Sequence, residues 1–98
     1  MANYRLTPAA KSDLLEIWNY TFNIWGENQA EKYLLGIEKI LDQLADNSGL
    51  GKWRPEINQD YYSFPCNKHI IFYIKSDGAI DIIGILHGKM DISKYFEI

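Results

Sequence analysis

The sequence predicts an α+β fold in which an antiparallel helical hairpin packs on one face of a small, mainly antiparallel sheet. Three observations lead to this prediction: a short alternating N-terminal segment, two consecutive amphipathic segments of helical period, and a C-terminal half dominated by β-prone runs. The predicted order is β-α-α-β-β-β, followed by a short C-terminal tail or helix. The 98 residues suffice for one hydrophobic core and are too few for two, so residues 1–98 are expected to form a single domain.

The N-terminal quarter is expected to contain a strand followed by a helix. Residues 3–6 alternate polar and apolar side chains, as a half-buried strand does. Thr7 and Pro8 then predict a helix start, because a hydroxyl can cap the free N–H groups and proline is favoured at the first helical position. Apolar side chains recur at three- and four-residue intervals as far as Trp25, and Gly26 is expected to end the helix.

A second amphipathic helix is expected after Gly26. Asn28, followed three residues later by Glu31, resembles a capping box, in which two side chains satisfy free N–H groups at a helix start. Residues 46–49 are expected to close this helix, and so short a link between two amphipathic helices predicts an antiparallel hairpin. The predicted buried face of the second helix consists of Ala30, Tyr33, Leu34, Ile37, Ile40, Leu41 and Leu44.

The C-terminal half is expected to supply the rest of the sheet. Residues 52–60 are polar and predict an irregular loop. Residues 61–64, 68–75 and 79–87 are rich in strand-forming side chains, and the Ser-Asp-Gly sequence of residues 76–78 is typical of a hairpin turn.

Both long predicted strands carry apolar side chains on both faces. Two helices can cover only one face of such a sheet, so the other must lie under the tail after Met90 or under a partner. Strict alternation would place Ile80 and Ile82 on one face with Leu86, and Ile83 and Ile85 on the other. The candidates for a face that a partner covers are Ile71, Tyr73, Ile83 and Ile85.

Composition and charge exclude several classes of function. The single cysteine, Cys66, excludes an internal disulfide and offers no pair of metal ligands, and we expect no metal or cofactor. No apolar run approaches the ~20 residues that cross a bilayer, and the N-terminus lacks the apolar stretch of a signal peptide. A cytoplasmic protein without membrane contact is therefore expected. The net charge of −3 is opposite in sign to that of most nucleic-acid binders, so direct nucleic-acid binding is not expected.

Several segments together resemble the ParE-type toxins of the RelE/ParE toxin–antitoxin superfamily. The resembling segments are residues 9–14, 17–20, 25–30, 33–34, 50–52, 62–65, 69–73 and 85–91. The resemblance implies the RelE/ParE fold, DNA gyrase as the usual target, and a cognate ParD-like antitoxin that blocks the toxin in a hetero-oligomer. Such an antitoxin is expected to lay a helix against the hairpin and an extended segment along the sheet, over the four apolar candidates above.

The same superfamily contains RelE-type ribonucleases, which cut messenger RNA on the ribosome, and the shared fold does not separate the two branches. RNA cleavage without a metal needs groups that orient the 2′-hydroxyl, stabilise the phosphate and protonate the leaving oxygen. This chain offers Lys52, Arg54, His69 and Tyr95, and His69 takes the strand position of a key arginine in that branch. Gyrase inhibition without catalytic residues is therefore our first hypothesis, and ribosome-dependent cleavage is the alternative. A chain that only binds its antitoxin and aids repression is a third.

The target-binding candidates combine basic, aromatic and histidine side chains. Three of them, Lys52, Trp53 and Arg54, lie in the central loop and suit an acidic protein surface. A solvated loop with Trp53 packed on the helices is an equal alternative. The two histidines share a face by strand phase, where they would act in binding or only hydrogen-bond at the sheet edge. Cys66 lacks an orienting third group that would make it a nucleophile with His69. The candidates are Lys52, Trp53, Arg54, His69, His87, Lys89, Met90 and Tyr95.

Overall fold

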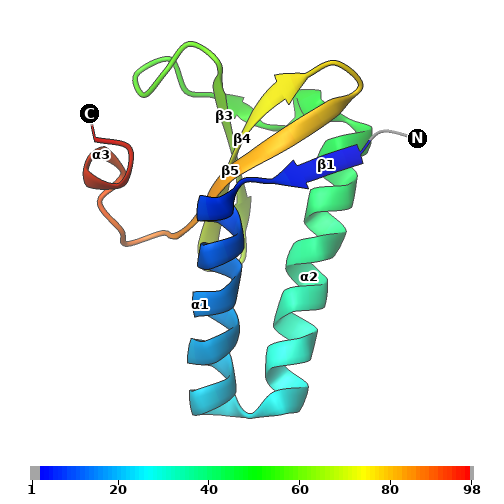
Figure 1. The fold of residues 1–98 in the computed structure, drawn as a ribbon, viewed down its shortest axis with the longest axis vertical. Helices are drawn as coiled ribbons and strands as arrows, with labels where there is room; N and C mark the ends of the chain where they lie inside the picture. The colour runs from blue at the N-terminus through cyan, green and yellow to red at the C-terminus, as the bar shows by residue number, and fades with distance from the viewer. Residues whose placement is uncertain (1–2, 98) are drawn as a thin grey trace.

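A helical hairpin packs on one face of a five-stranded sheet in the computed structural model, which describes residues 3–97 (Figure 1). The strand order is β1-β5-β4-β3-β2, in which only β1 and β5 are parallel. The predicted α+β fold is confirmed. The elements are β1 (Asn3–Leu6), α1 (Pro8–Trp25), α2 (Glu27–Asp46), a 3₁₀ turn η1 (Ser48–Leu50), β2 (Lys52–Trp53), β3 (Tyr61–Cys66), β4 (His69–Ser76), β5 (Ala79–His87) and α3 (Ile92–Tyr95).

The first helix begins and ends where its local chemistry predicts. The Thr7 hydroxyl accepts a hydrogen bond of 3.2 Å from the Ala10 N–H, which satisfies one of the free donors of the first turn. Gly26 follows the last residue of α1 with a φ of +89°, a conformation that favours glycine. Both predictions for the ends of α1 are confirmed.

None of the helices within residues 3–97 is long and apolar enough to span a membrane.

The capping box predicted at Asn28 and Glu31 is wrong. The second helix already begins at Glu27, and no side chain in the described part of the chain caps its N-terminus. Gly26 alone turns the chain between the two helices, so Asn28 lies inside the first turn of α2 and not before it. The antiparallel hairpin that results is visible in Figure 1, where α1 and α2 lie side by side.

The core lies between the hairpin and one face of the sheet. The predicted apolar face of α2 is confirmed, since Ile37, Leu41 and Leu44 are at most 2% exposed. The sheet contributes side chains from β3, β4 and β5 to the same cluster. The buried core residues are Ala10, Ile17, Ile37, Leu41, Leu44, Ala45, Cys66, Ile71, Tyr73, Ile80, Ile82 and Ile85.

A β-bulge in β5 changes which of its side chains share a face. Opposite the consecutive residues Phe72 and Tyr73 of β4, the fifth strand carries one extra residue, Ile83. The predicted alternation is therefore wrong beyond this point. Ile82 and Ile85, which it placed on opposite faces, both lie in the core under the helices. One inserted residue shifts the side-chain phase by one, and an apolar run gives no sign of it.

The chain's own tail covers part of the second sheet face. Phe72 is fully buried, although its neighbours along β4 point into the core on the other side. The ring of Phe96, directly after α3, lies 5.2 Å from the Phe72 ring and 5.2 Å from the Tyr61 ring, both in edge-to-face geometry. The second face was expected to lie under the tail after Met90 or under a partner, and the tail thus covers part of it.

Candidate functional site

A cleft of about 730 Å³ opens beside α1, the first turns of α2 and the end of the sheet. Tyr20, Ile24 and Trp25 line it from α1 and are 66%, 53% and 68% exposed. So large an apolar surface in contact with water is typical of a site that binds another protein. Its polar end holds Asp13, Glu16, Tyr33, Lys68, His69 and His87.

The two histidines face each other in this cleft. His69 and His87 are direct partners across β4 and β5, and their rings lie 5.3 Å apart in edge-to-face geometry. The prediction that they share a face is confirmed. The Tyr33 hydroxyl lies 2.6 Å from His69 Nδ1, and the Lys89 N–H donates to His87 Nδ1 at 3.2 Å. Burial and the neighbouring imidazole lower the pKa of His69, with Asp13 acting in the opposite direction, so His69 is mainly neutral at pH 7.

The basic-aromatic loop lies at the outer edge of the sheet. Residues 52–60 are not wholly irregular as predicted, because Lys52 and Trp53 form the short strand β2 and pair with β3. Both side chains are exposed. Trp53 is 53% exposed and donates its indole N–H to the Gln59 carbonyl at 2.7 Å, so it holds the loop and does not pack on the helices.

Arg54 is turned toward the second sheet face. Its Nε donates to the Glu56 carboxylate at 2.7 Å, and one terminal nitrogen donates to Ser63 Oγ at 2.9 Å. The guanidinium carbon also lies 5.4 Å from the centre of the Phe72 ring. With its side chain only 17% exposed, Arg54 is largely occupied within the fold.

Tyr95 is likewise held by the protein. Its hydroxyl donates to Asp13 Oδ2 at 2.7 Å. Burial, together with this bond and the carboxylate charges of Asp13 and Glu16, raises the pKa of the phenol. A phenol whose proton is bound to a carboxylate and whose pKa is raised is a poor general acid near pH 7.

The residues that a ribonuclease would use do not converge. His69 points into the cleft beside the helices, whereas Arg54 reaches Ser63 and Phe72 on the other face of the sheet. The sheet itself separates the two side chains. Lys52 lies on the short edge strand β2.

Cys66 does not form a reactive pair, although it is the register partner of His69. Its side chain is 3% exposed, and burial raises the pKa of the thiol, so the thiolate is disfavoured. Within residues 3–97, no group of three or more His, Cys, Asp or Glu side chains could hold a metal ion.

The four apolar candidates do not form an uncovered sheet face, and that prediction is wrong. Ile71, Tyr73 and Ile85 are at most 2% exposed in the core under the hairpin, and only Ile83, at the bulge, is partly exposed. The hairpin covers the face that carries Ile71 and Tyr73, and the bulge brings Ile85 to the same side. In this conformation these three side chains are closed to a partner, apart from the edge of Ile85 at the cleft.

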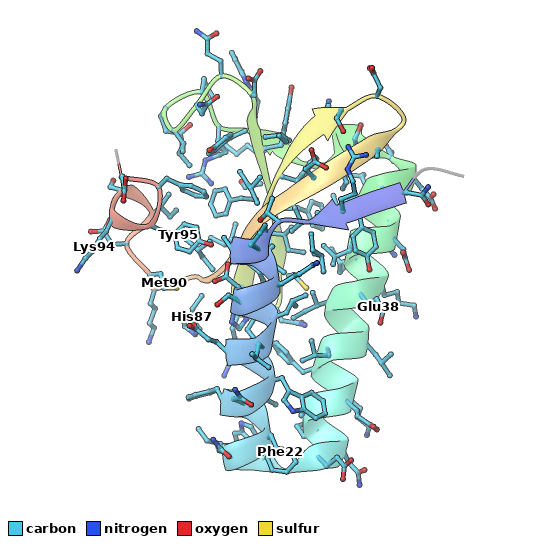
Figure 2. All side chains as sticks on the ribbon, in the orientation of Figure 1. Phe22, Glu38, His87, Met90, Lys94 and Tyr95 are labelled. Atoms are coloured by element: carbon cyan, nitrogen blue, oxygen red, sulfur yellow. The ribbon has the colours of Figure 1, made fainter. Side chains whose placement is uncertain are left out.

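Several candidates gather along the segment that leads from β5 to α3, which begins at the cleft, since His87 and Met90 line it. Figure 2 shows His87, Met90, Lys94 and Tyr95 on the same side of the molecule. His87 and Lys89 are exposed, and Met90 is 47% exposed. Asp13, which binds Tyr95 here, was not predicted from the sequence, because a lone acidic residue on a helix carries no signal of a distant partner.

Comparisons with known proteins agree with this architecture. The profile of the family described as "ParE toxin of type II toxin-antitoxin system, parDE" matches residues 4–92. The chain is 36% identical over 94 residues to Toxin ParE1 of Mycobacterium tuberculosis, which covers 95% of this chain and 96% of that protein.

Two solved structures share the fold. One is described as "Chromosomal ParDE TA system from P. aeruginosa" and has a TM-score of 0.76 at 19% identity, covering 89% of this chain and 96% of the other. The other, the "YoeB-YefM complex from Staphylococcus aureus", has a TM-score of 0.59 at 21% identity, covering 89% and 97%. The family itself follows from the profile and the near full-length relative. The chain belongs to the ParE toxin family of type II toxin–antitoxin systems.

Proposed function

We propose that this chain is a cytoplasmic toxin that binds DNA gyrase, disrupts its DNA-cleaving cycle, and is held inactive by a cognate ParD-like antitoxin. The observation that carries the choice of gyrase over RNA is the separation of Arg54 and His69 by the sheet. Groups on opposite faces cannot act on one phosphodiester, so catalysis of RNA cleavage by these side chains is not supported. The family membership supports the toxin role itself.

The proposed gyrase-contact surface consists of exposed basic and apolar side chains. Lys52 and Trp53 form one part, at β2, and His87, Lys89 and Met90 form the other, before α3. Tryptophan and methionine are enriched at protein interfaces, and lysines give local positive charge on a chain whose net charge is −3. This surface therefore fits an acidic region of a protein partner. The remaining candidates, Arg54, His69 and Tyr95, would hold the neighbouring segments in place.

The cleft beside α1 is the proposed antitoxin site. Its wall of Tyr20, Ile24 and Trp25 would receive the apolar face of an amphipathic helix. A partner with basic side chains suits the Asp13 and Glu16 carboxylates at the other end. The similarity in fold to chains from the ParDE and YoeB-YefM systems supports an antitoxin partner.

Expression of the chain without an antitoxin tests the target. We expect DNA breakage and an SOS response while bulk protein synthesis continues. Immediate loss of protein synthesis with intact DNA would instead support ribosome-dependent RNA cleavage, with Lys52, Arg54, His69 and Tyr95 as the residues to substitute together. Expression with no growth arrest would contradict a toxin and favour a chain that only binds its antitoxin.

Inhibition of purified gyrase tests the surface. The double substitution Lys52→Glu with Lys89→Glu should weaken inhibition of supercoiling about tenfold, which corresponds to ~1.4 kcal/mol of binding free energy. The matched control is Lys32→Glu with Lys39→Glu on exposed positions of α2, which changes the net charge equally. Equal inhibition by the two double variants would place the contact elsewhere.

A further inference from the structure

Asp13 joins parts of the chain that lie far apart in the sequence. Along the outer side of β5, pairing with β1 ends at Ile82, and no strand within residues 3–97 pairs with the next residues of β5 on that side. The Ile85 N–H donates to Asp13 Oδ2 at 2.9 Å. The same oxygen accepts the Tyr95 hydroxyl at 2.7 Å. One carboxylate thus connects α1, the free part of the β5 edge and α3.

The third helix depends on such tertiary contacts. It spans only Ile92–Tyr95, and a helix of one turn is not stable on its own in water. The Tyr95 ring lies over Gly84, where an added Cβ would come within 3.1 Å of it. Phe96 packs on Phe72 from the same side. Ring packing holds α3 near the sheet, and the bond to Asp13 is the directional contact that sets its orientation.

The segment that ends in α3 presents charge and apolar surface outward. Lys89, Met90 and Lys94 are exposed, while Tyr95 points back toward the sheet and α1 (Figure 2). A rotation of α3 would therefore move this surface. The hydrogen bond from the Tyr95 hydroxyl to the Asp13 carboxylate opposes that rotation. The position of the exposed side chains therefore depends on a contact on the inner side of α3.

We propose that Asp13 is a positioning residue of this toxin, which acts through Tyr95 to hold α3 and the exposed Lys89–Lys94 segment in the orientation that binds the target. This inference rests on the proposed function, because it takes that segment as part of the target-contact surface. Asp13 itself does not touch the target. Its effect reaches the surface through the hydroxyl of Tyr95 and the edge of β5.

Three substitutions separate the contact from the packing. Tyr95→Phe removes only the hydroxyl and keeps the ring on Gly84, whereas Asp13→Ala removes both hydrogen bonds. Asp13→Asn leaves a carbonyl oxygen that can accept both bonds, so it should keep the wild-type orientation of α3. The matched controls are Tyr4→Phe and Asp42→Ala. The Tyr4 hydroxyl makes no hydrogen bond within residues 3–97, and Asp42 lies at an exposed position of α2.

Growth arrest, gyrase inhibition, antitoxin affinity and amide hydrogen exchange are measured on each variant. Tyr95→Phe and Asp13→Ala should lose about tenfold in potency, with faster exchange at residues 92–96. Asp13→Asn should match the wild type in potency and exchange, and the controls should match it in every measurement. Tyr95 does not line the cleft, so the antitoxin affinity of Tyr95→Phe should fall less than its potency. The split between potency and antitoxin affinity is a result that a general loss of folding would not produce.

Wild-type potency of Tyr95→Phe, or unchanged exchange at residues 92–96, would overturn the proposal. So would an equal loss of antitoxin affinity and potency in Tyr95→Phe. If Asp13→Ala does not fold, Tyr95→Phe decides. If the wild-type chain does not inhibit gyrase, the proposed target is wrong, and growth arrest together with hydrogen exchange still decides the role of Asp13.

Discussion

Tyr73 combines a place in the core with a contact to the loop that leads to β2. Its ring is fully buried and stacks on Tyr62 with centroids 5.7 Å apart. Its hydroxyl accepts the Gly51 N–H at 3.0 Å and donates to the Ser48 carbonyl at 2.7 Å. Burial raises the pKa of this phenol, which therefore stays protonated and can keep both roles at physiological pH. Tyr73, which the sequence pattern assigned to a face covered by a partner, thus links the core to the Lys52–Trp53 segment.

The substitution Tyr73→Phe should destabilise the fold by about 1–3 kcal/mol, because the partners of the hydroxyl lose their hydrogen bonds. Urea unfolding measures the free energy, and hydrogen exchange at residues 51–53 should become faster. Tyr62→Phe is the control, since it changes a neighbouring ring without removing a hydrogen bond found within residues 3–97. Equal stability of the two variants would show that the ring alone positions the loop.

At the scale of elements, the connection from α2 to β2 is fitted closely around that hydroxyl. A Cβ added at Gly51 would overlap Tyr73 Oη and come within 2.7 Å of two ring carbons. At Gly49, in η1, an added Cβ would meet only the Asn47 side chain, at 3.4 Å. The two neighbouring glycines therefore differ in how much space the fold leaves them.

Gly51→Ala should displace β2 from its pairing with β3 and destabilise the protein by about 1–3 kcal/mol, the usual cost of forcing an extra methyl group into a packed site. Thermal unfolding measures the stability, and the fluorescence of the exposed Trp53 reports the movement of β2. Gly49→Ala should change neither by a comparable amount. An unchanged melting temperature for Gly51→Ala would contradict the close fit.

The helix boundaries show which local signals are sufficient. Thr7 and Gly26 predicted the two ends of α1, because capping and positive φ are set within a few residues of chain. Asn28 misled the prediction for α2, since a capping residue needs a chain segment before the helix, and Gly26 leaves none. A capping motif therefore predicts a helix start only where a non-helical segment precedes it.

At the scale of the whole molecule, the sheet divides the protein into two regions with different chemistry. On the side of the hairpin lies the cleft, with exposed aromatic groups and two paired histidines. On the other side, Arg54, Phe72 and Phe96 pack on one another. Of the proposed gyrase surface, Lys52 and Trp53 at β2 lie outside this cleft, whereas His87 and Met90 line it. Substitutions at β2 can therefore affect the gyrase contact without changing the proposed antitoxin site.

The stability of the whole fold should fall as the pH is lowered from about 7 to 5. The folded state lowers the pKa of His69 below its ordinary value of 6.5, so the unfolded chain binds more protons in that range. The stabilising contribution of neutral His69 is present above pH 6.5 and is lost as the pH falls through that value toward the lowered pKa. The groups that face the ring are His87, Asp13 and Tyr33.

Urea unfolding at a series of pH values checks this expectation. His69→Gln should show a smaller decrease between pH 7 and pH 5 than the wild type. Because the carboxylates titrate in both proteins, the difference between the two curves isolates the histidine. Parallel curves would contradict a lowered pKa for His69.

The sequence by itself determined the order of the elements apart from the short strand β2, most of their boundaries and the apolar face of α2, because period, caps and turns act between residues that are close in the chain. Only the tertiary structure decided the bulge at Ile83, the buried position of Ile71 and Ile85, and the contact of Asp13 with Tyr95. Each of these depends on which strand edge or face meets a segment that is distant in sequence. Residue type alone does not specify such tertiary contacts, since hydrophobic burial is non-directional and a carboxylate can accept from any donor that the fold brings within reach.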